Sequence, residues 1–173
     1  DTVDASLTVS ALKLRDRVWD LVVGMEKLGS DAHKIVAQAR LTAEATAPQM
    51  APLSAAPPKD AQEIDRADFY TSLEDAGLLY GPSFRPVDGL ACAAGRAEAS
   101  LQAPDIAPLG RAALNPCQLD GGFQVVAAAL QSLDRDAMAG VWVPTGCARL
   151  ALHRALPSSA RVVASLVDGP FFP

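Results

Sequence analysis

The feature that most constrains the fold is a single apolar stretch at residues 116–131, whose spacing predicts one long helix. Its apolar side chains Leu119, Phe123, Val126 and Leu130 recur at intervals of three and four residues. Pro116 suits the first position of such a helix, because its φ angle is already helical and its missing N–H is not needed there. The segments before and after it show strand patterns. The sequence therefore predicts an α+β protein with one central helix.

Two polar side chains interrupt this apolar helix on one face. Asp120 and Gln124 are four residues apart, so they lie one above the other on the helix. Gly121 and Gly122 follow the acid and each cost roughly 1 kcal/mol relative to alanine in a helix. We therefore expect something to approach the backbone closely beside Asp120. The polar pair predicts a chemical site, and the alternative is a structural pair in which the amide satisfies a half-buried carboxylate.

The chain before the central helix divides into three parts. Residues 1–45 are extended and predict a hairpin, with its turn at Gly29-Ser30-Asp31, preceded by a further strand. Residues 46–64 begin with a stretch that has no periodicity and carries four prolines, which is typical of a linker. A second helix is then expected to begin at Asp65 or Asp68 and to end at Gly77.

The remaining segments of the second domain predict strands at 84–93, 96–101, 141–152 and 160–167. Antiparallel sheets wrapped around a single apolar helix form the layered arrangement called the hotdog fold. We therefore predict the α+β hotdog class, with the main domain at residues 65–173.

Composition excludes several classes of function. The net charge of −5 and a pI near 4.9 come without a basic stripe, which argues against nucleic acid and acidic lipid as partners. No apolar run approaches the ~18 residues of a membrane helix, and no secretion signal is visible. Three cysteines without a CxxC pair predict neither a disulfide framework nor a metal site. We expect a cytoplasmic protein without a bound metal.

Two motifs together resemble those of polyketide synthase dehydratase domains. They are YGPSF at 80–84 and NPCQLDGGFQ at 115–124, with Asn115 where the family often has histidine before the proline. Such domains are double hotdogs, and these motifs belong to the second half. The resemblance implies that residues 1–45 are the terminal strands of an N-terminal hotdog, that 46–64 are a linker and that 65–173 are the C-terminal hotdog.

The resemblance also implies an activity: elimination of water from a β-hydroxyacyl thioester carried by an acyl carrier protein. Asp120 would be the general acid and Gln124 would orient it, because hydroxide is a poor leaving group and needs an acid that is still protonated. No cofactor is implied, since the substrate arrives on the phosphopantetheine of the partner carrier protein. The implied substrate-binding residues come from the turn: Tyr80, Gly81, Pro82 and Phe84.

The family's histidine motif, HxxxGxxxxP, does not occur in this chain, and neither His33 nor His153 has its spacing. The sequence therefore leaves open whether the chain is part of an active hydro-lyase. The alternatives are a cyclase of the product-template type or an isomerase with the same fold, and a catalytically incomplete hotdog that binds an acyl chain or serves a structural role. Other domains of a synthase are expected partners, and a homodimer is a further expectation.

Overall fold

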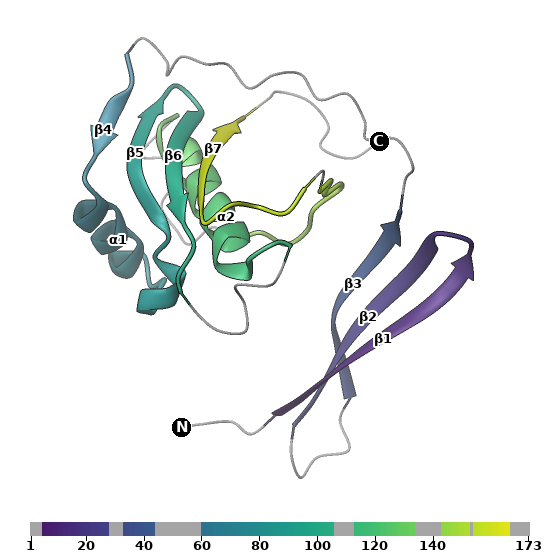
Figure 1. Ribbon diagram of the computed structural model, residues 1–173. Helices are drawn as coiled ribbons and strands as arrows, with labels where there is room; N and C mark the ends of the chain where they lie inside the picture. Colours follow the sequence, from purple (N-terminus) through teal and green to yellow (C-terminus); the bar gives the residue numbers. More distant parts are fainter. Residues whose placement is uncertain are drawn as a thin grey trace. The chain divides into compact units, whose positions relative to one another are not determined.

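The computed structural model describes residues 5–27, 33–43, 60–105, 113–133, 143–152 and 154–166 (Figure 1). The chain divides into two compact units, Asp1–Met50 and Ala51–Pro173. Most of the predicted linker, 46–64, lies outside the described residues, but Gln62–Ile64 form a short strand, β4. The assignment of the two units to two hotdogs stays a prediction.

The first unit is a three-stranded antiparallel sheet in the order β1-β2-β3. Its strands are β1 (Ala5–Arg15), β2 (Val18–Lys27) and β3 (His33–Thr42). The predicted hairpin preceded by a strand is confirmed, while its turn lies outside the described residues.

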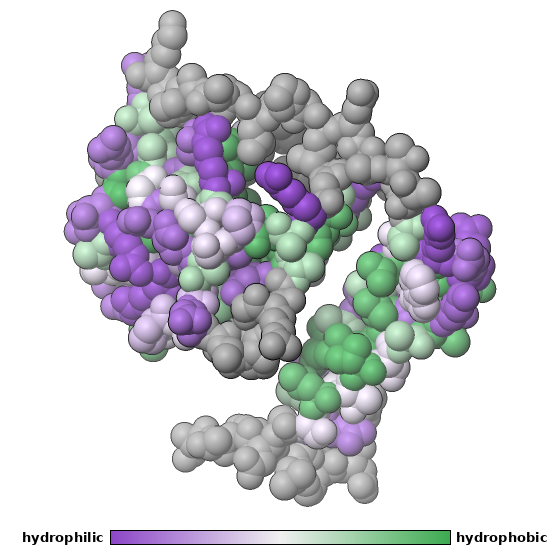
Figure 2. All heavy atoms as spheres, viewed as in Figure 1, coloured by the Kyte–Doolittle hydropathy of each residue, from purple (hydrophilic) through white to green (hydrophobic). Residues whose placement is uncertain are grey.

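One face of this three-stranded sheet is apolar. Residues paired across antiparallel strands share a face, and two such rows are Val9–Val23–Ala37 and Ala11–Leu21–Ala39. The opposite face carries an ion pair between Asp20 and Arg40, with 2.7 Å between Oδ1 and Nε. Val9 remains 68% exposed, and Figure 2 shows apolar residues gathered on the surface of this unit.

The second unit contains a four-stranded antiparallel sheet in the order β4-β5-β6-β7 (Figure 1). Its other strands are β5 (Val87–Ala93), β6 (Arg96–Gln102) and β7 (Ser159–Ser165). Helix α2, Pro116–Gln131, contacts β5, β6 and β7, and helix α1, Arg66–Asp75, contacts β5. An antiparallel sheet packed against a central helix confirms the predicted α+β hotdog fold.

The core lies between this sheet and the helices. In β6 the side chains alternate, so Ala97, Ala99 and Leu101 are buried while the residues between them face outward. Helix α2 contributes Val125 and Ala129, which are fully buried. Helix α1 adds larger side chains to the same cluster, namely Phe69, Tyr70 and Leu73.

Helix α2 itself is confirmed, but the face predicted to be buried is wrong: Val126 is 38% exposed, and Leu119, Phe123 and Leu130 are only half-buried. The buried face carries smaller and polar side chains, namely Cys117, Gln118, Gly121, Gln124, Val125, Ala128 and Ala129. Small side chains on this face let α2 approach the sheet closely, as at Gly121 beside Leu101.

The strand predicted at 141–152 is wrong for its described part. Residues 143–152 are exposed and form no strand. Pro144 has no N–H to donate to a ladder, and β6 already pairs with β5 on one side and with β7 on the other. The strand predicted from residue 84 begins only at Val87, because Pro82–Phe84 form a 3-10 turn, η1.

Candidate active site

Helix α2 begins at the Asn-Pro pair of the second motif. The Asn115 side chain accepts a hydrogen bond from the Cys117 N–H at 2.9 Å, and Pro116 occupies the first helical turn. Asn115, which stands where the resembling family often has histidine, therefore acts as the N-terminal cap. This cap fixes where the helix starts, and it places Asp120 one turn further along.

The buried Gln118 ties this end of α2 to the segment before β7. Its Nε2 donates to the carbonyl of Pro157 at 2.9 Å. The side chain is almost completely buried, so its amide needs such partners.

Helix α1 and the turn that follows it form the second wall of the site. Asp65 caps α1 by accepting from the Ala67 N–H at 2.7 Å, as the sequence predicted. After the turn, Arg85 donates through Nε to the Tyr80 carbonyl at 2.9 Å and forms an ion pair with Glu74 of α1. These contacts hold the turn at 80–84 against the end of α1.

The structure brings the two predicted catalytic residues into direct contact. Gln124 Nε2 donates to Asp120 Oδ2 at 2.8 Å and to the main-chain carbonyl of Phe84 at 3.0 Å. Gln124 is only 2% exposed, whereas Asp120 is half-buried. One amide therefore connects the acid on α2 to the turn at 80–84.

Tyr70 of α1 was not among the site residues predicted from the sequence, yet it contacts this site. Its hydroxyl donates to Gln124 Oε1 at 3.1 Å and accepts from the Val87 N–H at 3.0 Å. Burial is the main cause that raises the pKa of Tyr70 above its usual value. The signal in the sequence was the amphipathic nature of tyrosine itself, since a buried tyrosine hydroxyl usually has a hydrogen-bond partner.

The residues predicted to bind substrate differ in their exposure. Tyr80 is half-buried, and its pKa is raised by burial and then by the negative charge of Asp120, so the two side chains interact electrostatically. Gly81 and Pro82 are exposed, and a Cβ added at Gly81 would meet nothing within 4 Å. Phe84 is 41% exposed. Whether these residues contact a substrate stays a prediction.

The two glycines after Asp120 have different surroundings. A Cβ on Gly121 would lie 2.5 Å from Pro86 Cγ and 3.0 Å from Leu101 Cδ2, so the expected close approach exists there. A Cβ on Gly122 would meet nothing within 4 Å. The expectation of a crowded backbone is therefore met at Gly121 and not at Gly122.

This difference predicts opposite effects of two alanine substitutions. Gly122→Ala should stabilise the protein by about 0.5–1 kcal/mol, because it removes backbone freedom without a clash. Gly121→Ala should destabilise it, because overpacking costs about 1–3 kcal/mol and exceeds the same helix gain. Thermal unfolding of the two variants would measure this. A lower melting temperature for Gly122→Ala than for Gly121→Ala would contradict the packing described here.

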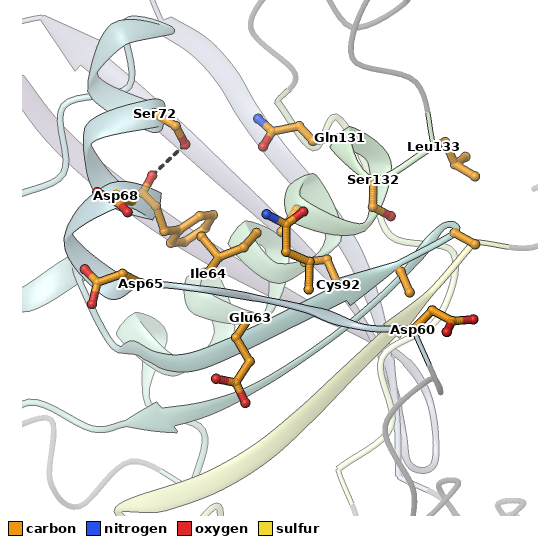
Figure 3. Close-up of a pocket in the computed structure, with 15 residues that line it drawn as sticks. Asp60, Glu63, Ile64, Asp65, Asp68, Ser72, Cys92, Gln131, Ser132 and Leu133 are labelled. Carbon is orange, nitrogen blue, oxygen red and sulfur yellow. Dashed lines mark hydrogen bonds between the residues drawn. The ribbon is translucent and has the colours of Figure 1, made fainter.

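A cavity of about 870 Å³ lies elsewhere in the second unit, between α1, β4 and the C-terminal end of α2. Figure 3 shows Asp65 and Asp68 near the start of α1, and Ser132 just beyond α2. None of the predicted site residues lines it.

Two further findings concern metal ligands and membrane-spanning helices. In the part of the chain that the structure describes, no three His, Cys, Asp or Glu side chains group together as metal ligands. No helix of that part is long and apolar enough to cross a membrane. His153 and the side chain of His33 lie outside the described positions.

Comparison with known proteins identifies the family. Residues 48–169 match the model described as the polyketide synthase dehydratase N-terminal domain. The match covers more than half of the chain, which therefore belongs to the polyketide synthase dehydratase family. This description names an N-terminal domain, whereas the motifs at 80–84 and 115–124 predict the second hotdog. The position of this hotdog within a double hotdog stays a prediction.

The individual proteins that this chain resembles are polyketide synthases or their dehydratase domains. A polyketide synthase-nonribosomal peptide synthetase of Pyricularia grisea, pyiS, is 34% identical over 93 residues, which are 53% of this chain and 2% of that protein. The dehydratase domain from the CurK module of the curacin polyketide synthase matches with a TM-score of 0.80 at 18% identity, over 99% of this chain and 61% of that one.

A third relative is the dehydratase domain from the terminal module of the rifamycin polyketide synthase. It matches with a TM-score of 0.59 at 26% identity, over 72% of this chain and 49% of that one. The chain thus spans about three fifths of the solved CurK domain, half of the rifamycin domain and a small part of the fungal synthase.

Proposed function

We propose that this chain is part of a dehydratase that eliminates water from a β-hydroxyacyl thioester, with Asp120 as the general acid. The observation that carries the proposal is the 2.8 Å hydrogen bond from Gln124 to Asp120, beside the turn at 80–84. It supports a carboxyl group that is held in one orientation, and Asp120 is still half-exposed.

The proposed step breaks three bonds, the O–H of Asp120, the C–O and the α-C–H, and forms three, the O–H of water, the bond from the base to hydrogen and the second C–C bond. Asp120 gives its proton to the β-hydroxyl oxygen, and the C–O bond breaks to release water. A base takes the proton from the neighbouring α-carbon, and the electron pair of that C–H bond forms the C=C double bond. General acid catalysis of this kind contributes about 10²–10⁴-fold to a rate.

The base of this reaction is proposed to be a histidine of another segment of the synthase. The CurK dehydratase is described as inactive when a histidine is replaced by phenylalanine, and as inactive when an aspartate is replaced by asparagine. This chain carries an aspartate in a matching motif and lacks the HxxxGxxxxP motif. Both facts support a division of the two roles between this chain and a further segment.

Substrate binding is proposed at the turn that Gln124 joins to the acid. Tyr80, Gly81, Pro82 and Phe84 would line the entry for a thioester presented on the phosphopantetheine of a carrier protein, and no other cofactor would be used. The electrostatic interaction of Tyr80 with Asp120 and the open space at Gly81 support this assignment.

The first unit is proposed to be the terminal strands of an N-terminal hotdog. Its apolar rows, such as Val9–Val23–Ala37, would require a covering element of the same domain, because a sheet of three strands gains most of its stability from a buried face. The proposed surroundings are a cytoplasmic synthase with its other domains, and the domain would pair as a homodimer.

An intact-mass assay tests the proposed reaction directly. The complete dehydratase region of the synthase, including residues 1–173, would be incubated with a β-hydroxyacyl carrier protein. We expect the acyl carrier protein to lose the mass of one water. An unchanged mass would contradict dehydration. Of the alternatives, an isomerase would then show a changed product of equal mass, and an acyl-binding hotdog would show unchanged substrate.

A further inference from the structure

We propose that Tyr70 is a positioning residue that determines which oxygen of Asp120 carries the transferable proton. The inference rests on the proposed role of Asp120 as an acid. It concerns the hydrogen-bonded chain that runs from Val87 through Tyr70 and Gln124 to Asp120.

The hydrogen bonds at Tyr70 have a fixed direction. A backbone N–H can only donate, so the Val87 N–H gives its hydrogen to the Tyr70 oxygen. The hydrogen of Tyr70 is then available for Gln124 Oε1, 3.1 Å away. Because its pKa is raised by burial, this phenol keeps its hydrogen near neutral pH.

The hydrogen bond at the nitrogen end of the Gln124 amide also has a fixed direction. A backbone carbonyl can only accept, so the Gln124 atom that faces the Phe84 carbonyl at 3.0 Å must be the nitrogen. An amide has one oxygen and one nitrogen, and their positions are easily exchanged by rotation. Here the Tyr70 hydroxyl donates to the amide oxygen and the Phe84 carbonyl accepts from the amide nitrogen, so both contacts favour the same orientation of the Gln124 amide.

Asp120 lies at the end of this hydrogen-bonded chain. One N–H of Gln124 is used by Phe84, and the other points to Asp120 Oδ2 at 2.8 Å. Oδ2 therefore accepts this hydrogen bond. A carbonyl oxygen accepts more strongly than a hydroxyl oxygen, so the bond favours the proton of the neutral acid on Oδ1. With the amide reversed, the acid would donate to Gln124 Oε1 instead, and its proton would be held away from the substrate.

Two arginines keep the Tyr70 ring in place. The guanidinium carbons of Arg66 and Arg85 lie 5.7 and 5.3 Å from the centre of the ring. Arg66 also donates to the Val87 carbonyl at 3.1 Å, on the same residue whose N–H binds Tyr70. The ring and its backbone partner are therefore fixed together.

A double-mutant cycle tests the role of Tyr70. In the complete dehydratase region, Tyr70→Phe keeps the ring and removes the hydroxyl. We expect kcat to fall about five- to tenfold, which corresponds to one hydrogen bond, while KM changes by less than about twofold. If Tyr70 acts through Gln124, Tyr70→Phe combined with Gln124→Leu should lose no more than Gln124→Leu alone. Losses that multiply in the double variant would overturn the inference.

The matched control is Ser72→Ala, which removes another hydroxyl from α1. This hydroxyl donates to the Phe69 carbonyl at 2.7 Å, within the helix and outside the chain to Asp120. Its kcat should equal that of the wild type. An equal loss in Ser72→Ala would mean that Tyr70 matters only for the stability of α1, and it would overturn the inference.

A second measurement does not depend on turnover. The side-chain NH₂ signals of Gln124 in an NMR spectrum report its two bonds to Phe84 and Asp120. In Tyr70→Phe we expect these signals to shift or broaden as the amide begins to rotate. Unchanged signals would refute the inference even if the wild type showed no dehydration, whereas an inactive wild type with shifted signals would refute only the proposed reaction.

Discussion

Replacing Asp120 with asparagine should slow dehydration at least about 100-fold, because general acid catalysis contributes about 10²–10⁴-fold to a rate. Asparagine has nearly the shape of aspartic acid, and its oxygen can still accept the bond that Gln124 now donates at 2.8 Å. It has no acidic proton for the departing hydroxyl. Single-turnover mass spectrometry on the complete dehydratase region would measure the loss of water from the acyl carrier protein.

The control for this substitution is Asp88→Asn. Asp88 is exposed on β5, so the change makes the same replacement of a carboxyl by an amide away from the Gln124 network. Its rate and melting temperature should match those of the wild type. Equal rates for Asp120→Asn and wild type would contradict the assignment of Asp120 as the acid. Equal melting temperatures for the three proteins would show that a slower reaction comes from the lost acid and not from a loss of folding.

The parts of this site that the sequence predicted depend on short separations along the chain. Asp120 and Gln124 are four residues apart on one helix, so their contact follows from helical geometry alone. The Asn115 cap and Pro116 mark the start of the same helix. A reader of the sequence can therefore place the acid and its amide correctly.

The contact that the sequence could not predict joins distant residues. Tyr70 and Gln124 are 54 positions apart, and only the packing of α1 beside α2 brings them together. Periodicity counts Tyr70 as one more apolar side chain of α1. The direction of its hydroxyl depends on the Val87 N–H, which no pattern of side chains reveals.

The expectations that the structure did not meet have a related cause. Residues 141–152 have the composition of a strand, but a strand must also pair with a neighbour, and the described part, 143–152, pairs with neither edge strand of the sheet, β4 or β7. Gly121 and Gly122 are identical in sequence, yet only Gly121 faces Pro86 and Leu101. Local pattern thus predicts the type of an element better than its surroundings.

The largest effect on stability is expected at Phe69 of α1. Its side chain is 2% exposed, and its ring centre lies 5.2 Å from that of Tyr70. Phe69→Ala should therefore lower the free energy of unfolding by about 3–5 kcal/mol. Phe69 also lines the cavity between α1 and α2, so its removal would enlarge an existing space. Urea unfolding, with a reduced midpoint at an unchanged slope, would measure the loss.

Leu79→Ala provides the matched control, because Leu79 follows the same helix and is 82% exposed. Its free energy of unfolding should stay within about 0.5 kcal/mol of the wild type. A loss below about 1 kcal/mol in Phe69→Ala would mean that α1 does not belong to the cooperative core. Tyr70 could then not be held firmly enough to orient Gln124, since α1 carries both rings. The stability of α1 and the direction of the acid's proton are therefore linked through two adjacent residues, Phe69 and Tyr70.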